Sequence, residues 1–224
     1  MNDINNVKKE IENILECLIK SCMSVQQQYP IIKEYGDNIK RLEWNNITNL
    51  SVCLKNIDYS SIYNEINKNR DYTLKLVDGN IIQLLYTFKN GKLYSHRLAM
   101  FPSPDLEAFQ NEPEIYEQDE IYADIISKKI VSFPLRFDYC VDDIQSTHTH
   151  PHSHVSLGEY KNCRIPAYGP ISPIVFMNFV LENFYNTYFL QIYNHYNIKN
   201  KCHNIFTIKD DEKRKIHFNM MYHD

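Results

Sequence analysis

Apolar residues recur at helical spacing at the start of the chain. Between residues 3 and 28 they lie three or four positions apart, with Lys and Glu between them, as in an amphipathic helix. Asp3 is the expected N-cap, and Pro30 ends the segment. The pattern predicts a helix over 3–28 that buries one face, followed by a short helix or an irregular connection over 31–44.

The pattern changes to short strands and turn signals after this first part. We expect a strand over 47–54 and a short helix over 60–68, capped by Ser60 or Ser61. A β-meander follows, because Asp-Gly and Asn-Gly pairs between apolar runs favour tight hairpin turns, and a Pro-Ser-Pro segment closes it. The expected meander strands are 72–77, 80–88 and 93–101, with turns at 78–79 and 90–91. Further strands are expected over 131–140, 148–157 and 160–167.

Ser172 and Pro173 mark the start of a second clear helix, as N-cap and first helical residue. Its broad apolar face predicts a long helix near 172–193 that packs on the sheet. Two short segments at the C-terminus, 205–208 and 215–221, predict a last hairpin. The fold class is therefore α+β: an antiparallel meander sheet packed by an N-terminal helix and this long helix.

Domain organisation follows from the absence of a repeat or a convincing linker. We expect one domain over 1–224, with an N-terminal helical part over 1–70 and a β-rich core over 71–224. A chain of 224 residues can bury a sizeable core without covalent staples.

Composition narrows the possible functions. The formal net charge of −4 argues against broad, non-specific nucleic-acid binding, which needs a basic surface, but it allows a local basic pocket. With 5 glycines and neither a P-loop nor a dinucleotide-binding motif, a Gly-rich phosphate loop is not expected. The 6 cysteines form no C-x-x-C pair. No signal peptide or membrane span is visible, so we expect a cytoplasmic protein with no membrane association.

The most unusual segment places four histidines at alternate positions, 148, 150, 152 and 154. In a strand, alternate side chains share one face, at a spacing of about 6.5–7 Å. Pro151 cannot donate to a strand ladder, so the strand is an edge or begins after it. His148 is therefore expected in a loop, and His150 and His154 are the stronger candidates for a site.

These histidines allow three roles. They can ligate zinc or another divalent metal, with a third ligand from Asp138 or His96. They can act as general acid and base, and two imidazoles with a nearby Arg suffice for metal-free cleavage of RNA. They can also be exposed or hydrogen-bonded residues of an edge strand without chemistry. Spacing alone leaves the three roles open.

Arginines supply a second group of candidates. In the segment from Leu135 to Tyr139, Arg136 and Asp138 share the face opposite the apolar residues, where Arg136 can bind phosphate and Asp138 can orient an imidazole. A plain ion pair within the sheet is the alternative. Arg164 can add a phosphate contact. His96 and Arg97 are neighbours on one strand and point to opposite faces, so they cannot both serve one pocket.

Several strings in this order resemble a bacterial domain-of-unknown-function family, number 2290. The strings are Asp78-Gly79 with Ile82-Gln83, His96-Arg97-Leu98, Phe101 to Pro104, Phe133 to Asp138, His150 to His154 with Gly158, Cys163 to Pro166, Ser172-Pro173 and Phe184-Tyr185. The family pattern His-Pro-x-Ser-His implies that His150 and His154 matter and that His148 and His152 are local additions. The family implies no reaction. A more distant similarity to TumE-like toxins, thought to act on RNA, favours a ribonuclease.

The leading hypothesis is a ribonuclease-like domain of a bacterial toxin or phage-defence system, working with a cognate protein partner and without a cofactor. His150 and His154 would exchange protons, Arg136 and Arg164 would hold the phosphate, and Asp138 would orient an imidazole. The second hypothesis is a non-catalytic accessory subunit that docks on a larger partner. The third is a zinc hydrolase with His150, His154 and Asp138 as ligands.

Overall fold

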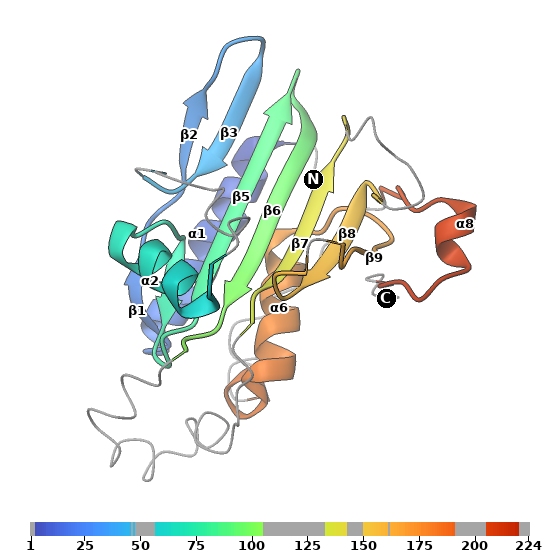
Figure 1. Ribbon diagram of the computed structural model, residues 1–224. Coiled ribbons are helices and arrows are strands. Elements are labelled where there is room, and N and C mark those ends of the chain that lie inside the picture. The colour runs from blue at the N-terminus through green and yellow to red at the C-terminus, as the bar shows by residue number, and fades with distance from the viewer. Residues whose placement is uncertain are drawn as a thin grey trace.

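The computed structural model describes residues 3–45, 47, 57–104, 133–142, 150–160, 162–190 and 205–219. In these residues a nine-stranded antiparallel sheet is packed by helices (Figure 1), which confirms the expected α+β class. The strands are β1 (Ser24–Gln27), β2 (Ile31–Glu34), β3 (Ile39–Glu43), β4 (Leu74–Leu76), β5 (Ile81–Lys89), β6 (Lys92–Phe101), β7 (Leu135–Cys140), β8 (Ser153–Leu157) and β9 (Ile165–Pro166).

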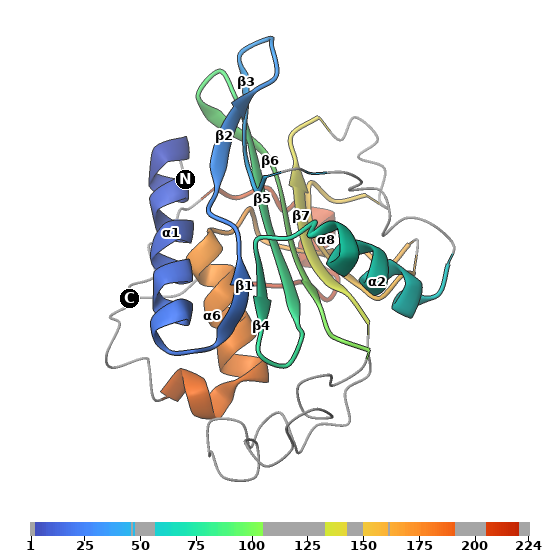
Figure 2. The ribbon, with the colours of Figure 1, turned by 90° about the vertical axis from the view of Figure 1, so that its left-hand side faces the viewer.

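The sheet has a covered face and a more polar one. Its order is β1-β4-β5-β6-β7-β8-β9, and the β2–β3 hairpin continues it by pairing β3 with the far part of β5. Helices α1 (Ile4–Lys20) and α6 (Pro173–Phe184) lie side by side on one face, which we call the helix face (Figure 2). Helix α2 (Tyr59–Asn69) covers one end of the other face, which we call the open face.

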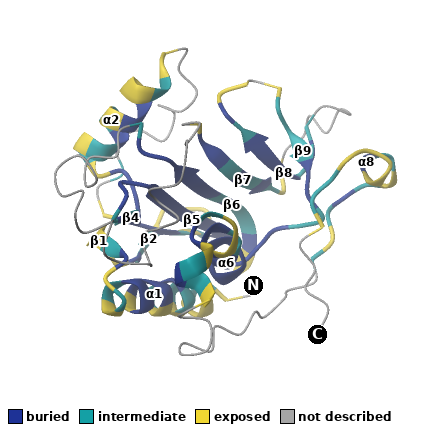
Figure 3. Ribbon diagram, turned by 90° about the horizontal axis from the view of Figure 1, so that it is seen from below, coloured by how far each residue is buried: buried dark blue, intermediate teal, exposed yellow. Residues whose placement is uncertain are grey.

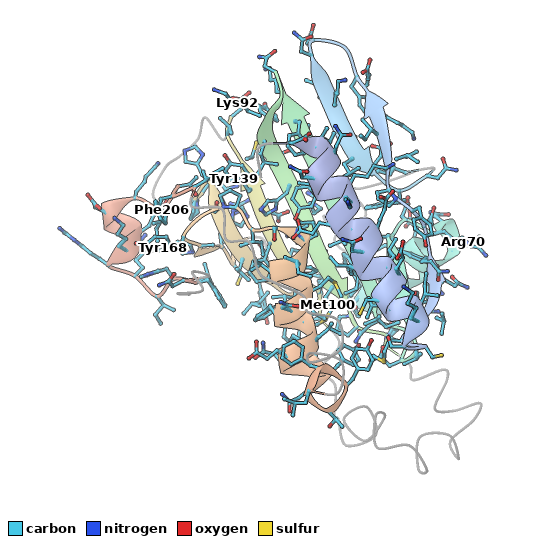
Figure 4. The ribbon with its side chains drawn as sticks, turned by 180° about the vertical axis from the view of Figure 1, so that it is seen from behind. Arg70, Lys92, Met100, Tyr139, Tyr168 and Phe206 are labelled. Carbon is cyan, nitrogen blue, oxygen red and sulfur yellow. The ribbon has the colours of Figure 1, made fainter. Side chains whose placement is uncertain are left out.

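Most of the hydrophobic core lies between the sheet and the helix face. The buried stripe of α1, which includes Ile11 and Leu15, packs with α6 residues such as Phe176 against inward residues of the central strands. Phe137 contacts Phe176 edge-to-face at 5.7 Å. Figure 3 shows the buried central strands on one side of the neighbouring helices α1 and α6, and the exposed outer side of α1. Met100 and Tyr139 belong to this core (Figure 4).

The N-terminal part differs from the prediction. Helix α1 ends at Lys20 and not at 28, because Ser21 caps it and Cys22 takes a left-handed conformation with φ of 59°. The next residues form strand β1, which pairs with β4. The short helix or irregular connection expected over 31–44 is wrong, since β2 and β3 form a hairpin there. The described part of residues 1–70 therefore contains strands β1, β2 and β3 as well as the helices α1 and α2. The strand expected over 47–54 lies almost wholly outside the described residues.

The later elements follow the prediction more closely. The meander of β4, β5 and β6 and both of its turns are confirmed. The capping prediction for the short helix is wrong, since Asp58 and not Ser60 or Ser61 caps α2. Ser172 caps α6, as expected, but α6 ends at Phe184 and the chain is helical again over 186–190.

The C-terminal hairpin is also wrong. The segment from 205 forms the short helix α8 (Asp210–Lys213) and then pairs Phe218 with Ala167 in a parallel bridge. The side chain of Phe218 packs on Phe137, so apolar burial explains the return of the chain to the sheet. Figure 4 shows Tyr168 and Phe206 beside α8, with their rings 5.3 Å apart. In the described part of the chain, no helix is long and apolar enough to cross a membrane.

Candidate functional site

The register of the strands determines which side chains meet on the open face. Directly opposed residues of antiparallel strands point to the same face. One row runs Leu85, Arg97, Asp138, His154 and Pro166 across β5 to β9. The next row runs Gln83, Ala99, Arg136 and Ser156. Arg136 and Asp138 on β7 and His154 on β8 therefore lie on one face of neighbouring strands. The alternation within β7 predicted the shared face of Arg136 and Asp138.

Asp138 is the centre of this group. Its carboxylate lies 3.3 Å from Nε of Arg97, 3.9 Å from Nε of Arg136 and 3.9 Å from Nε2 of His154. Its side chain is 18% exposed and that of Arg136 only 13%, so these charges interact with little screening by water. Among the described residues, the buried Nε of Arg136 has no hydrogen-bond partner. The carboxylate of Asp138 thus holds the guanidinium groups of Arg97 and Arg136 near the imidazole of His154.

His154 has a defined tautomer and a changed basicity. Its Nδ1 donates a hydrogen bond to the carbonyl oxygen of Pro151 at 3.0 Å, because a carbonyl can only accept. In the neutral ring, Nε2 then carries the lone pair and faces Asp138. Burial lowers the pKa of His154, while the charge of Asp138 acts in the opposite direction. His154 is therefore neutral and able to accept a proton at neutral pH.

His150 reaches His154 by a route that strand geometry did not predict. Strand β8 begins only at Ser153, so the alternation expected from residue 148 onward is wrong for the described positions before it. The chain around Pro151 nevertheless brings the His150 ring to 5.2 Å from the His154 ring, at an interplanar angle of 71°. Nδ1 of His152 donates instead to the carbonyl oxygen of Cys140. His148 lies outside the described residues.

Two further arginines complete the group. Arg164 directly precedes β9, whose Pro166 pairs with His154. After burial and the contributions of its other neighbours, the Arg164 charge also lowers the pKa of His154. Arg97 is the residue that sequence reasoning missed. Its position on the face opposite to His96 was predicted, but its pairing with Asp138 depends on the β6–β7 register.

His96 belongs to the core and not to this group. It lies on the helix face between the rings of Tyr86 and Tyr139, at 5.5 and 5.7 Å. Its Nε2 accepts a hydrogen bond from the backbone N–H of Ile171 at 3.2 Å. Burial lowers its pKa to about 4. His96 is therefore a neutral core histidine, and it lies on the wrong face to join Asp138 as a metal ligand.

The described residues contain no group of three His, Cys, Asp or Glu side chains placed to hold a metal ion. The set proposed for zinc, His150, His154 and Asp138, is close in space but does not converge on one point. The arrangement instead combines a neutral imidazole, a second imidazole in ring contact with it, and guanidinium groups. Such a set can bind an anion and transfer protons.

A family model described as "Uncharacterized conserved protein (DUF2290)" matches residues 23–220. The chain belongs to this family. The DUF2290 match covers every residue of the group around Asp138, and it confirms the resemblance seen in the motifs. No curated protein and no solved structure matches the chain, so the similarity to TumE-like toxins has no support beyond the short motifs.

The strings that carry the DUF2290 resemblance separate into two places in the fold. One set, including Arg136, Asp138, His150 and His154, forms the group on the open face. Another forms a buried junction at the β4–β5 turn, where Tyr185 at the end of α6 donates to Asp78 at 2.7 Å. The junction explains its strings by structure alone.

Proposed function

We propose that the open face of this protein cleaves RNA by metal-free acid–base chemistry. The observation that carries the proposal is the contact of His150 and His154 beside an Asp138 that holds Arg97 and Arg136. Paired imidazoles supply a base and an acid, and guanidinium groups are the protein donors best suited to phosphate. The 2′-hydroxyl of RNA provides the nucleophile.

The tautomer of His154 assigns the roles. Its Nε2 takes the proton from the 2′-hydroxyl while the 2′-oxygen forms a bond to phosphorus. The bond from phosphorus to the 5′-oxygen breaks, and protonated His150, which is the more exposed ring, gives that oxygen its proton. The products are a 2′,3′-cyclic phosphate and a 5′-hydroxyl. Arg136, Arg164 and Arg97 stabilise the charge on the phosphoryl oxygens, and Asp138 favours the imidazolium of His154.

A bacterial toxin or phage-defence system would suit such an activity, with an antitoxin or a larger defence subunit as cognate partner. Gene neighbours test this setting: an antitoxin-like gene next to this one supports a toxin, and a nuclease gene supports an accessory role. The accessory role is the second candidate, in which the protein binds a partner without catalysis. The ion pairs of Asp138 with Arg97 and Arg136 favour it, because such pairs also stabilise a sheet.

The direct test is RNA cleavage in EDTA by the wild type, His150→Ala, His154→Ala and His152→Ala. His152 is the matched control, since its ring is committed to the Cys140 carbonyl oxygen. We expect loss of roughly 10²–10⁴-fold for His150→Ala and His154→Ala and near-wild-type cleavage for His152→Ala. Folded wild-type protein that leaves RNA intact overturns the proposal. A melting temperature several degrees lower in His154→Ala, without any activity to lose, supports the accessory role.

A further inference from the structure

We propose that a row of cationic side chains on the open face binds the single-stranded RNA that leads to the site. We call this row the basic track; its residues are Lys33, Arg41, Arg97, Arg136 and Arg164. The inference rests on the proposed function for the identity of the ligand, but its geometry is independent of catalysis. It predicts an extended single strand as the substrate and not an isolated phosphodiester.

Strand pairing places the far end of the basic track on the open face. Lys33 pairs with Arg41 across the β2–β3 hairpin, and Arg41 pairs with Thr87 on β5. Thr87 pairs with Ser95, which lies two residues from Arg97 on the same face of β6. At about 4.8 Å between neighbouring strands, the path from β2 through β3, β5, β6 and β7 to β8 spans about 24 Å. A path of this length holds several nucleotides.

The charge balance of this path favours a polyanion. The basic track contains five cationic groups, and the carboxylates of Glu43 and Asp138 lie among them. Glu43 has no exposed side-chain surface; it lies 2.9 Å from Nζ of Lys33 and 3.7 Å from a guanidinium nitrogen of Arg41. The side chains of Lys33 and Arg41 keep 40% and 30% exposure. Counted over the residues that the structure describes, this path is therefore locally positive on a chain whose formal net charge is −4.

The side chains along the path suit a single strand. Thr87 and Ser95, between Arg41 and Arg97, are small and uncharged; Thr87 is buried and Ser95 half-buried, so Ser95 is the point of this stretch where a sugar–phosphate backbone can approach the sheet. The buried Nε atoms of Arg41 and Arg136 lack a hydrogen-bond partner among the described residues. Next to Arg41, Tyr35 is 48% exposed, and the Arg41 guanidinium lies over its ring, 4.5 Å from the ring centre. An exposed aromatic ring beside arginine is the usual platform for an unpaired base.

Binding is tested with fluorescein-labelled 2′-O-methyl RNA of roughly ten nucleotides, which has no free 2′-hydroxyl and is not cleaved. Polarisation is measured against salt for the wild type, Lys33→Ala, Arg41→Gln and Lys40→Ala. Lys40 is the matched control: it neighbours Arg41 on β3 but pairs with Phe88, so it points to the other face. Each track variant should weaken binding and flatten the salt slope by about 0.7 per lost phosphate contact, while Lys40→Ala should match the wild type.

Two outcomes overturn the basic track: no binding by the wild type, or equal effects of Lys40→Ala and the track variants. Thermal melting identifies a variant that fails to fold. If Arg41→Gln fails to fold, the binding of Lys33→Ala tests the basic track, because the Lys33 side chain is more exposed than that of Arg41. Cleavage of a dinucleotide by the wild type judges the proposed function separately. Cleavage without binding that depends on the basic track supports the proposed function and overturns the basic track. Binding that depends on the basic track without cleavage supports the basic track and overturns the proposed function.

Discussion

The ring of His154 is held by a hydrogen bond from its Nδ1 to the carbonyl oxygen of Pro151, 3.0 Å away. This bond leaves Nε2 as the basic atom and directs it to Asp138. Pro151 precedes strand β8, so its carbonyl lies at the point where the chain enters the sheet. The orientation expected from Asp138 therefore comes from a backbone carbonyl, and Asp138 contributes charge.

Replacing Asp138 with Asn should lower the pKa of His154 further. The reason is that Asp138 is the charge that raises this pKa against burial. The substitution also leaves Arg97 and Arg136 without their carboxylate, so we expect stability to fall by about 1–3 kcal/mol. Titration of the His154 ring by NMR and urea unfolding measure the two effects.

Asp142→Asn is the control for this substitution. Asp142 accepts a hydrogen bond from Tyr94 at an exposed position beyond the end of β7. We expect its loss to change stability by less than about 0.5 kcal/mol and to leave His154 unchanged. A His154 titration that is the same in Asp138→Asn and in the wild type contradicts the assigned interaction.

Stability should fall in mild acid because His96 is buried in its neutral form. Its folded pKa is about 4, against 6.5 in the unfolded chain. Above pH 6.5 the ring is neutral in both states; between pH 6.5 and 4 only the unfolded chain binds the proton, so stability falls as pH falls. The loss amounts to at most about 3 kcal/mol, most of it complete by pH 4.

His96→Gln isolates this contribution, because the amide oxygen of Gln can accept the Ile171 N–H in place of Nε2. Urea unfolding between pH 7.5 and pH 4 should show a shallower loss of stability in the variant than in the wild type. His154 adds a smaller loss of the same sign in both proteins, since its pKa is also lowered. Equal pH dependence in the two proteins contradicts the burial of a neutral His96.

Gly79→Ala should destabilise the β4–β5 turn more than Gly91→Ala destabilises the β5–β6 turn. Both glycines have positive φ, of 84° and 75°, so both substitutions carry a similar backbone cost of about 1–2 kcal/mol. A Cβ at Gly79 would also meet the Ser103 side chain at 2.9 Å, whereas a Cβ at Gly91 meets nothing within 4 Å. We expect an additional cost of about 1–3 kcal/mol at Gly79 in urea unfolding. Equal costs contradict the close packing of this turn.

Short sequence patterns predicted the turns of the meander and the start of α6. Asp-Gly and Asn-Gly turns identified the meander, and Ser172 with Pro173 identified the start of α6. The β2–β3 hairpin was missed because its residues are half-exposed and give no alternation. Its turn also lacks an Asn-Gly or Asp-Gly pair: the three residues Gly36, Asp37 and Asn38 all have positive φ there.

In the candidate site, too, the sequence predicted contacts within one strand but not contacts between strands that are distant in sequence. Arg136 and Asp138 were found because alternation within one strand places them together. Arg97 was missed because its contact with Asp138 depends on how β6 and β7 align, and residues 102–134 separate these strands in sequence. A shared strand face was predicted for His150 and His154, but strand β8 does not begin until Ser153, and the contact between their rings comes from the path of the chain around Pro151. Register between distant strands is a tertiary property that no local pattern contains.

The most direct test of RNA cleavage by this site is the chemistry of its products. Wild-type protein is incubated in EDTA with an RNA oligomer and with the same oligomer carrying one 2′-deoxynucleotide at the cleaved position. Because His154 is assigned to activate the 2′-hydroxyl, we predict 2′,3′-cyclic phosphate and 5′-hydroxyl ends from the first and no cleavage at the deoxy position of the second. Cleavage at the deoxy position, or 5′-phosphate ends, would mean that water is the nucleophile and would contradict the account.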